Sequence, residues 1–192
     1  MTDATRDKWD ARYRDAAAPG SPARVLADNL HLLPAAGAAL DLACGLGANA
    51  LLLAERGLTV SAWDISPVAI TRLQALADER GVEVQAEARD VLRQPPAPGS
   101  FDVIVVSHFL ERALAPALMA ALRPGGLLFY QTFTREGAGS RGPSNPAFRL
   151  GPNELLQLFT GLRLVLYREE GDIGDPAAGA RGEALLIGQR QA

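Results

Sequence analysis

The feature that most constrains the fold is a glycine-containing turn between an apolar run and a helix-like segment. Residues 38–43 (AALDLA) form a short apolar run that is typical of a buried parallel strand. Residues 48–56 predict a helix, and Gly57 is placed to end it. Gly45 and Gly47 lie in the turn, where a missing Cβ lets a ligand approach the backbone and a helix N-terminus presents unpaired N–H groups. The motif therefore predicts a ligand site at the end of a strand.

The rest of the chain continues this alternation of strands and helices. Ser66 as N-cap and Pro67 at the first helical position mark a helix that ends near Gly81. We expect a turn at 123–126, further strands at 58–64, 82–87, 101–106, 127–133, 162–169 and 182–188, and further helices at 5–15, 22–33, 114–122 and 152–159. This order predicts an α/β fold with a doubly wound, seven-stranded, mostly parallel sheet and helices on both faces. The last two strands lack a helix between them, so we expect a C-terminal antiparallel hairpin.

Composition narrows the class of protein. The 192 residues fit one domain, and one cysteine with two histidines provides neither a usual zinc site nor an intramolecular disulfide. A net charge of −3 gives no electrostatic ground for a nucleic-acid partner. No apolar run approaches the roughly 20 residues that span a bilayer, and the charged N-terminus does not read as a signal peptide. We therefore expect a cytoplasmic protein without metal, nucleic-acid or membrane partners, as a monomer or weak homodimer.

Two acidic residues near the turn bear on the identity of the ligand. Gly45-x-Gly47-x-x-Ala50 taken alone also fits a dinucleotide fingerprint, so the glycines leave the cofactor open. Asp41 lies inside the first strand, where a carboxylate suits a ligand that carries an ammonium group better than one that carries a pyrophosphate. Asp64 ends the second strand, where a carboxylate accepts hydrogen bonds from a ribose diol. Together the acids favour a nucleoside ligand with an ammonium group.

Residues 39–91 resemble the cofactor-binding half of class I S-adenosylmethionine-dependent methyltransferases. The resemblance implies S-adenosyl-L-methionine as the cofactor, with the turn after the first strand around its methionine part. It also implies an acid after the second strand on the ribose and an acid after the third strand on the adenine amino group. The implied cofactor residues are Ala43, Gly45, Gly47, Asp64, Ile65, Asp90 and Val91. Ala43 stands where the family most often has its first glycine.

The flanking segments resemble the tellurite-resistance and thiopurine groups of these methyltransferases. The resemblance is carried by Lys8-Trp9-Asp10-x-x-Tyr13, by Ala62-Trp63-Asp64, by residues 146–155 and by residues 167–170. In such enzymes an N-terminal helix covers the cofactor, so Trp9 and Tyr13, which share one side of a helix, are candidates for its inner face. Simple packing against the body is the alternative. We expect one domain, with residues 1–36 as a helical lid, 37–133 as the cofactor-binding core, 134–151 as a substrate-cover loop and 152–192 as a helix and hairpin.

The acceptor side is predicted from the ends of the fourth and fifth strands. Ser107 is expected near the methionine part of the cofactor, and His108 is the candidate base if the acceptor needs one. Tyr130 and Thr132 share one parity and are expected to face the acceptor, with Tyr130 as a second candidate catalytic residue. Cys44 has no base beside it in the sequence and is expected to serve packing.

Arginines in the 134–151 loop suggest an anionic acceptor. Arg135 and Arg149 are the candidate substrate residues, with Arg141 between them, and a solvated surface is the alternative. The expected reaction is methyl transfer to a small-molecule acceptor such as a thiol, a chalcogen oxyanion or another small nucleophile. Two alternatives stay open: an NAD(P)-dependent oxidoreductase and a non-catalytic S-adenosylmethionine-binding module.

Overall fold

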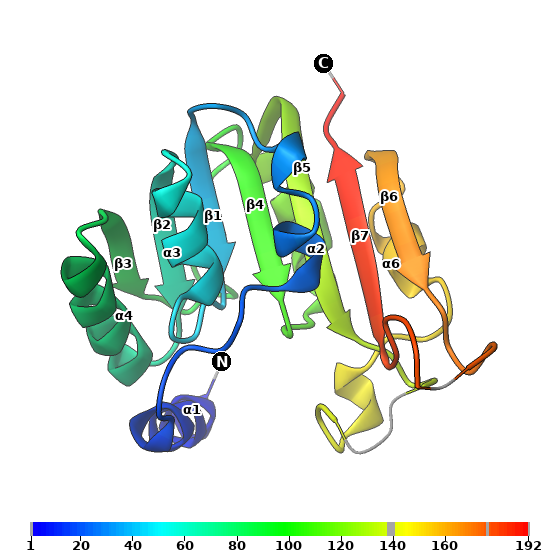
Figure 1. Cartoon of the computed structure of the whole chain (residues 1–192), viewed down its shortest axis with the longest axis horizontal. Helices are drawn as coiled ribbons and strands as arrows, with labels where there is room; N and C mark the ends of the chain where they lie inside the picture. The colour runs from blue at the N-terminus through cyan, green and yellow to red at the C-terminus, as the bar shows by residue number, and fades with distance from the viewer. Residues whose placement is uncertain (1, 138–140, 176, 192) are drawn as a thin grey trace.

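The protein is built on one seven-stranded sheet (Figure 1). A computed structural model describes residues 2–137, 141–175 and 177–191. The strands are β1 (Ala38–Leu42), β2 (Thr59–Asp64), β3 (Val84–Ala88), β4 (Phe101–Ser107), β5 (Leu122–Phe133), β6 (Arg163–Glu169) and β7 (Glu183–Gln189). Their order is β3-β2-β1-β4-β5-β7-β6, with β7 antiparallel to both β5 and β6 and the other pairs parallel. The predicted mostly parallel sheet with a C-terminal antiparallel hairpin is confirmed.

Helices cover both faces of the sheet. They are α1 (Asp3–Asp15), α2 (Arg24–Ala27), α3 (Ala48–Glu55), α4 (Pro67–Arg80), α5 (Ala115–Ala121) and α6 (Glu154–Leu158), with short 3-10 turns η1 (Leu30–Leu32), η2 (Arg112–Leu114) and η3 (Pro146–Phe148). One core cluster joins α2, α3 and α4 to one face, and a second joins α5 and α6 to the other. Leu128 and Phe129 are adjacent in β5 and fully buried in different clusters, as alternation along a strand requires.

Local signals explain the helix that follows β2. The Ser66 hydroxyl accepts a hydrogen bond from the Ala69 N–H, and Pro67 begins the helix. Gly81 ends it with φ 66°, a left-handed conformation that glycine adopts without steric cost. Both predicted ends of α4 are confirmed.

Two predicted elements differ from the structure. The single helix expected at 22–33 is broken into α2 and η1, because Asn29 has a non-helical backbone and its side-chain amide caps the Val25 carbonyl. The turn expected at 123–126 lies inside β5 as an interruption of the ladder with β4. The register passes from the pair Phe101–Leu122 directly to Val103–Leu127, so the residues in between bulge out of the ladder.

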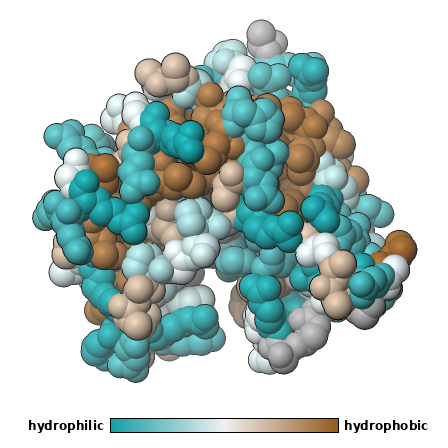
Figure 2. Space-filling model, viewed as in Figure 1, coloured by the Kyte–Doolittle hydropathy of each residue, from teal (hydrophilic) through white to brown (hydrophobic). Residues whose placement is uncertain are grey.

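The carboxyl ends of the parallel strands meet at one edge of the sheet. Leu42 of β1 lies opposite Trp63 of β2 and Val106 of β4, so the loops after these three strands start side by side. Helix α1 lies beyond this edge (Figure 1). The space-filling view shows a notch there, between α1 and the chain that follows β5 (Figure 2). In the described part of the chain no helix is long and apolar enough to cross a membrane.

Candidate active site

Helix α1 is fastened across the carboxyl edge by contacts with α4. The Ser66 hydroxyl donates to the Asp10 carboxylate. The Arg72 guanidinium donates to the Tyr13 carbonyl and, at 2.6 Å, to the Ala16 carbonyl at the end of the helix. A helix of 13 residues with no buried residue of its own is thereby held on the body by polar side chains.

Of the two aromatic residues of α1, Tyr13 lies on the turn after β1. Trp9 and Tyr13 stack with ring centroids 5.5 Å apart. The Tyr13 hydroxyl approaches Gly45 so closely that a Cβ there would lie 2.9 Å from it. Burial, followed by the charge of Asp64, raises the pKa of Tyr13, so the phenol stays protonated. Tyr13 therefore packs directly on the turn, and its role as a cover for a ligand stays a prediction.

The turn itself uses left-handed backbone at three positions. Ala43, Gly45 and Gly47 have φ of 57°, 54° and 80°. Gly47 also packs on α4, because a Cβ there would lie 2.2 Å from Leu73 Cδ1. Ala43 replaces the usual family glycine but keeps the glycine-like conformation, which costs a residue with a Cβ about 1–2 kcal/mol. Such strain is typical of functional loops.

Asp64 holds this turn in shape. One carboxylate oxygen accepts from the Gly45 N–H and the other from the Ser66 N–H, each at 2.9 Å. Burial raises the pKa of Asp64, and these N–H groups oppose the rise. Carboxylate oxygens have about four acceptor sites in all, so Asp64 can still accept from a ribose hydroxyl. Ile65, which follows it, is partly buried.

Asp41 has a different role from the one expected. It is fully buried and accepts from the Ala50 N–H at 3.0 Å and from the Asn49 amide at 3.4 Å. Burial raises the pKa of Asp41 to about 7. The expectation of a direct contact with a ligand ammonium is corrected, because no surface of Asp41 is exposed. It shapes the start of α3 through its bonds to Asn49 and Ala50.

Asn49 is a site residue that the sequence analysis missed. Its side-chain amide donates to the Ser107 hydroxyl at 3.0 Å, and its oxygen accepts from the Ala23 N–H at 2.8 Å. Ser107 is thereby joined to the first turn of α3, and its place near the methionine part of the cofactor stays a prediction. A polar residue in the otherwise apolar stretch 48–54 at the start of this predicted helix was the available signal.

Of the two residues predicted to bind the adenine, Asp90 and Val91, only Asp90 lies at the surface. Asp90 accepts from the Leu92 N–H at 3.0 Å and lies 3.6 Å from the Arg93 guanidinium. Val91 is 2% exposed and packs in the second core cluster. Its side chain therefore belongs to the core, which corrects the expectation that it lines the ligand surface.

His108 is hydrogen-bonded to a second residue that the sequence analysis missed. Its Nε2 lies 2.9 Å from the Glu183 carboxylate at the start of β7, and its ring stacks on Phe133 with centroids 4.7 Å apart. Gln131 donates to the other Glu183 oxygen at 2.7 Å. Burial acts to raise the pKa of Glu183, but His108, Arg141 and Gln131 outweigh it, so the pKa lies below its usual range. His108 thus faces a buried, ionised carboxylate.

The two residues expected on the acceptor side of β5 lie in the core. Tyr130 is 2% exposed and donates its hydroxyl to the Phe109 carbonyl at 2.8 Å, and burial raises its pKa. Thr132 is 1% exposed. The expectation was wrong because β5 is covered on both faces, so neither parity points into open space. The catalytic role expected of Tyr130 is therefore corrected to a packing role.

The loop arginines divide into structural and exposed groups. Arg149 is buried and donates to the carbonyls of Pro143 at 2.7 Å and Thr134 at 3.0 Å, so it holds the loop, and its expected substrate role is corrected. Arg135 is exposed and donates to the Pro146 carbonyl at 3.4 Å. The side chain of Arg141 is 76% exposed and lies 3.9 Å from Glu183. Residues 138–140 of the predicted cover loop lie outside the described residues.

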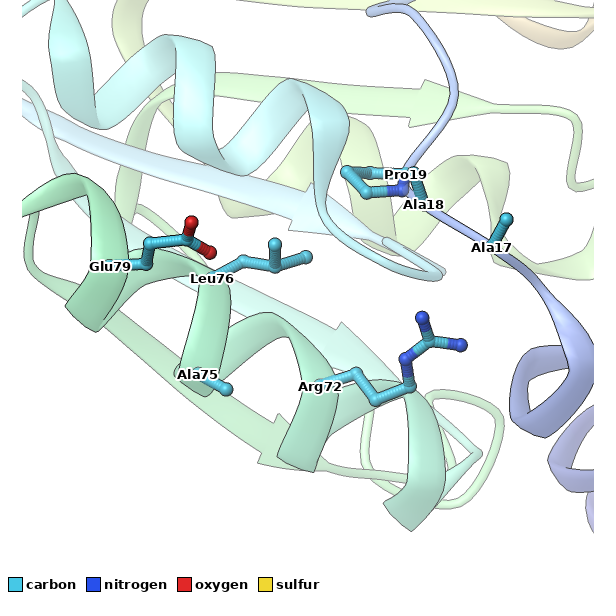
Figure 3. A pocket seen from close by; sticks show the side chains of 7 residues that line it. All are labelled: Ala17, Ala18, Pro19, Arg72, Ala75, Leu76 and Glu79. Carbon is cyan, nitrogen blue, oxygen red and sulfur yellow. The ribbon is translucent and has the colours of Figure 1, made fainter.

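A separate pocket of about 240 Å³ lies between α4 and the chain that follows α1 (Figure 3). Arg72, Leu76 and Pro19 are among its lining residues, and Arg72 reaches toward the end of α1 to make the carbonyl contacts described above. Its lining contains none of the predicted site residues. It is a gap beside the attachment of α1.

Comparison with known proteins shows which family the core of the chain resembles. Residues 39–126 match the model of the methyltransferase domain family. The ubiquinone biosynthesis O-methyltransferase of Idiomarina loihiensis is 35% identical over 103 residues, which are 50% of this chain and 42% of that protein. The enzyme of the same name from Xanthomonas axonopodis pv. citri is 34% identical over 147 residues, which are 67% and 60% of the two chains. The chain spans about half the length of these curated relatives.

Solved structures agree on the fold. A structure from work on the conversion of a disulfide bond into a thioacetal group during echinomycin biosynthesis superimposes with a TM-score of 0.74 at 27% identity, covering 97% of this chain and 92% of the other. TehB from Haemophilus influenzae superimposes with a TM-score of 0.68 at 20% identity, covering 97% and 67%. The sheet order, the glycine turn and these matches all point to a methyltransferase fold. The core of this chain, residues 39–126, matches a methyltransferase domain and is similar to the class I S-adenosylmethionine-dependent methyltransferases.

Proposed function

We propose that the chain transfers the methyl group of S-adenosyl-L-methionine to a small-molecule acceptor. The observation that carries this proposal is the turn after β1, in which Gly45 and Gly47 adopt left-handed backbone and the buried Asp64 accepts from the Gly45 N–H at 2.9 Å. A ligand that fits this turn needs a diol for the carboxylate and a slender part that lies on the glycines.

The residues present fit that cofactor. Bound there, it supplies a sulfonium methyl group that is activated without a metal. Asp64 would hold the ribose, and the turn from Ala43 to Gly47 would hold the methionine part. Tyr13 would cover the site from α1 and exclude water. Positioning of this kind contributes up to roughly 7–11 kcal/mol to catalysis in favourable cases.

The acceptor is proposed at the level of chemical class. One structural relative comes from work on a disulfide-to-thioacetal conversion, and the sequence relatives are named O-methyltransferases. Small nucleophiles such as thiols, chalcogen oxyanions and hydroxyl compounds are therefore the candidates. The narrower kinship with the tellurite-resistance or thiopurine groups stays a prediction. So do the lid role of residues 1–36, the cover role of 134–151, a cytoplasmic location, the lack of nucleic-acid and membrane partners, and a monomeric or weakly dimeric state.

Calorimetric titration with S-adenosylhomocysteine tests the proposal. We expect micromolar binding to the wild type, loss of at least about tenfold in affinity for Asp64→Asn, and no change for the control Asp78→Asn on the exposed side of α4. NADH is the competing ligand and is expected not to bind. A folded wild type that binds NADH and not S-adenosylhomocysteine would support the oxidoreductase alternative. Binding without turnover of the cofactor for any acceptor would support the non-catalytic alternative.

A further inference from the structure

We propose that His108, oriented by the buried Glu183, is the general base of the proposed methyl transfer, and that the acceptor therefore carries a proton on its attacking atom. The acceptor class is a phenol, an alcohol or a thiol rather than an aprotic anion such as a halide or a chalcogen oxyanion. This inference rests on the proposed function and narrows it.

The first support is a chain of buried hydrogen bonds that ends on the imidazole. The Val25 N–H donates to the Gln131 side-chain oxygen at 2.9 Å, which fixes the orientation of that amide. The Gln131 amide nitrogen then faces the Glu183 carboxylate at 2.7 Å, and the second carboxylate oxygen lies 2.9 Å from His108 Nε2. A carboxylate whose side chain is 7% exposed is costly to bury, so its partners on both oxygens are required.

The second support is the state of the ring. An ionised carboxylate only accepts hydrogen bonds, so Nε2 carries a proton toward Glu183 and Nδ1 holds the lone pair of the neutral ring. The side chain of His108 is 41% exposed, so an acceptor can reach it. Other charged groups near this pair are Arg141, 3.9 Å from the Glu183 carboxylate, and Arg149, which lies 5.9 Å from the centre of the Phe133 ring on which His108 stacks.

The third support is position. His108 directly follows Ser107, and Ser107 is bonded to Asn49 at the start of α3. The backbone of His108 is left-handed, with φ 54°, and its N–H donates to the Gln131 carbonyl at 2.8 Å. A residue with a Cβ rarely adopts this conformation unless its surroundings impose it, and such residues gather at functional sites. The base therefore lies one residue from the predicted cofactor side.

The chemical step balances without a further reactant. His108 Nδ1 takes the acceptor proton while the acceptor oxygen or sulfur forms a bond to the methyl carbon and displaces the neutral thioether, which keeps the electron pair of the broken carbon–sulfur bond. Glu183 stabilises the imidazolium that results, and His108 then returns the proton to solvent. A base in this position typically contributes about 10²–10⁴-fold to the rate. An aprotic anion would gain nothing from it.

Histidine NMR tests the pair without any turnover. The chain has two histidines, so an exposed-site variant, His31→Gln, assigns both rings and serves as the matched control. In ¹⁵N-labelled protein we expect His108 as the tautomer protonated at Nε2. In Glu183→Gln the preference for this tautomer is expected to weaken, because an amide oxygen accepts a hydrogen bond less strongly than a carboxylate does; Glu183→Asp keeps the charge and should restore part of the preference. The other tautomer, or an unchanged tautomer population in a folded Glu183→Gln variant, would overturn the assignment.

Turnover tests the acceptor class. We would assay 3,4-dihydroxybenzoate, 2-mercaptoethanol, iodide and tellurite by release of S-adenosylhomocysteine. We expect turnover of a hydroxyl or thiol compound, with kcat lowered about 10²-fold or more in His108→Gln and by less in Glu183→Gln. Affinity for S-adenosylhomocysteine is expected to stay within about twofold for both variants, and Glu83→Gln is the control carboxylate.

The outcomes separate this inference from the proposed function. Failure of the wild type to bind S-adenosylhomocysteine would remove the proposed function itself. Turnover of iodide or tellurite at a rate that His108→Gln does not change would leave methyl transfer intact and overturn the protic acceptor and the base.

Discussion

Replacement of Asp41 by asparagine is expected to stabilise the protein increasingly as the pH rises. Burial raises the pKa of this carboxyl to about 7 in the folded chain, against 3.8 for an ordinary aspartate. Between these two pH values the folded state keeps a proton that the unfolded state has lost, so the contribution of Asp41 to stability falls as the pH rises. The loss is complete above about pH 7 and amounts to on the order of 4 kcal/mol. Asparagine carries no charge and avoids this loss.

Urea unfolding of the wild type and Asp41→Asn between pH 4 and pH 8 measures the effect. The free energy of unfolding of the variant minus that of the wild type is expected to grow by up to about 4 kcal/mol over this range and to level off above pH 7. The asparagine oxygen can still accept from the Ala50 N–H, while its amide faces the Asn49 amide. That second contact adds a pH-independent constant to the difference in free energy of unfolding. The test is therefore how this difference changes with pH.

A difference that is equal at pH 5 and pH 8 would refute the reasoning, because it would mean that Asp41 ionises in the folded state as it does in the unfolded chain. Asp78→Asn, on the exposed side of α4, is the control variant.

The charge of Asp41 is also expected to matter for cofactor binding. A bound ammonium group nearby favours the ionised carboxylate, so binding near pH 6.5 should release protons, and Asp41→Asn should release fewer.

Three further changes test the turn and its cover. Ala43→Gly removes a Cβ from a residue at φ 57° and is expected to raise the free energy of unfolding in urea by about 1 kcal/mol; a loss would show that the left-handed backbone is not strained. Gly47→Ala would place a Cβ 2.2 Å from Leu73 Cδ1 at φ 80°, and we expect a loss of about 2 kcal/mol or more with weakened S-adenosylhomocysteine binding; wild-type values would contradict the packing described. Ser66→Ala removes the cap of α4 and the hydroxyl that donates to Asp10, so about 1 kcal/mol is expected to be lost and α1 to become sensitive to proteolysis; unchanged cleavage would mean that this contact does not hold the helix.

The fold and the turn could be predicted because their signals are local. The apolar run at 38–43, the glycines after it and the Ser66-Pro67 helix start each depend on neighbours within a few residues. Parallel pairing then brings the ends of β1, β2 and β4 to one edge without further information. Asp64 was identified by the same logic, since its place is set by the end of its own strand.

Burial was harder to predict than position along a strand. Parity alone placed Tyr130 toward the acceptor, but a strand in the middle of a sheet covered on both faces has no open side. Arg149 was expected on an exposed loop, yet its guanidinium is used by the carbonyls of Pro143 and Thr134. Both errors arise because coverage of a face depends on segments far away in the sequence.

The residues that were missed share one property: their partners are distant in the sequence. Gln131 and Glu183 are 52 residues apart, and Asn49 and Ser107 are 58 apart. A glutamate that begins an apolar strand reads as a solvent-facing residue until β7 is placed beside β5. Only then does it lie next to Gln131 and His108.

The side-chain amides of Asn49 and Gln131 are both held by the same segment of the chain. Two backbone N–H groups at the start of α2 donate to them, Ala23 to Asn49 and Val25 to Gln131. Each donor fixes which way its amide points, so one amide nitrogen is turned toward Ser107 and Asp41 and the other toward Glu183. The start of α2 thereby determines which partners the two amides donate to. Through these two bonds it contacts neither the glycine turn nor His108 itself. The fully buried Val25 and Leu26 hold this four-residue helix on the core, so a shift of α2 would disturb both hydrogen-bond networks together.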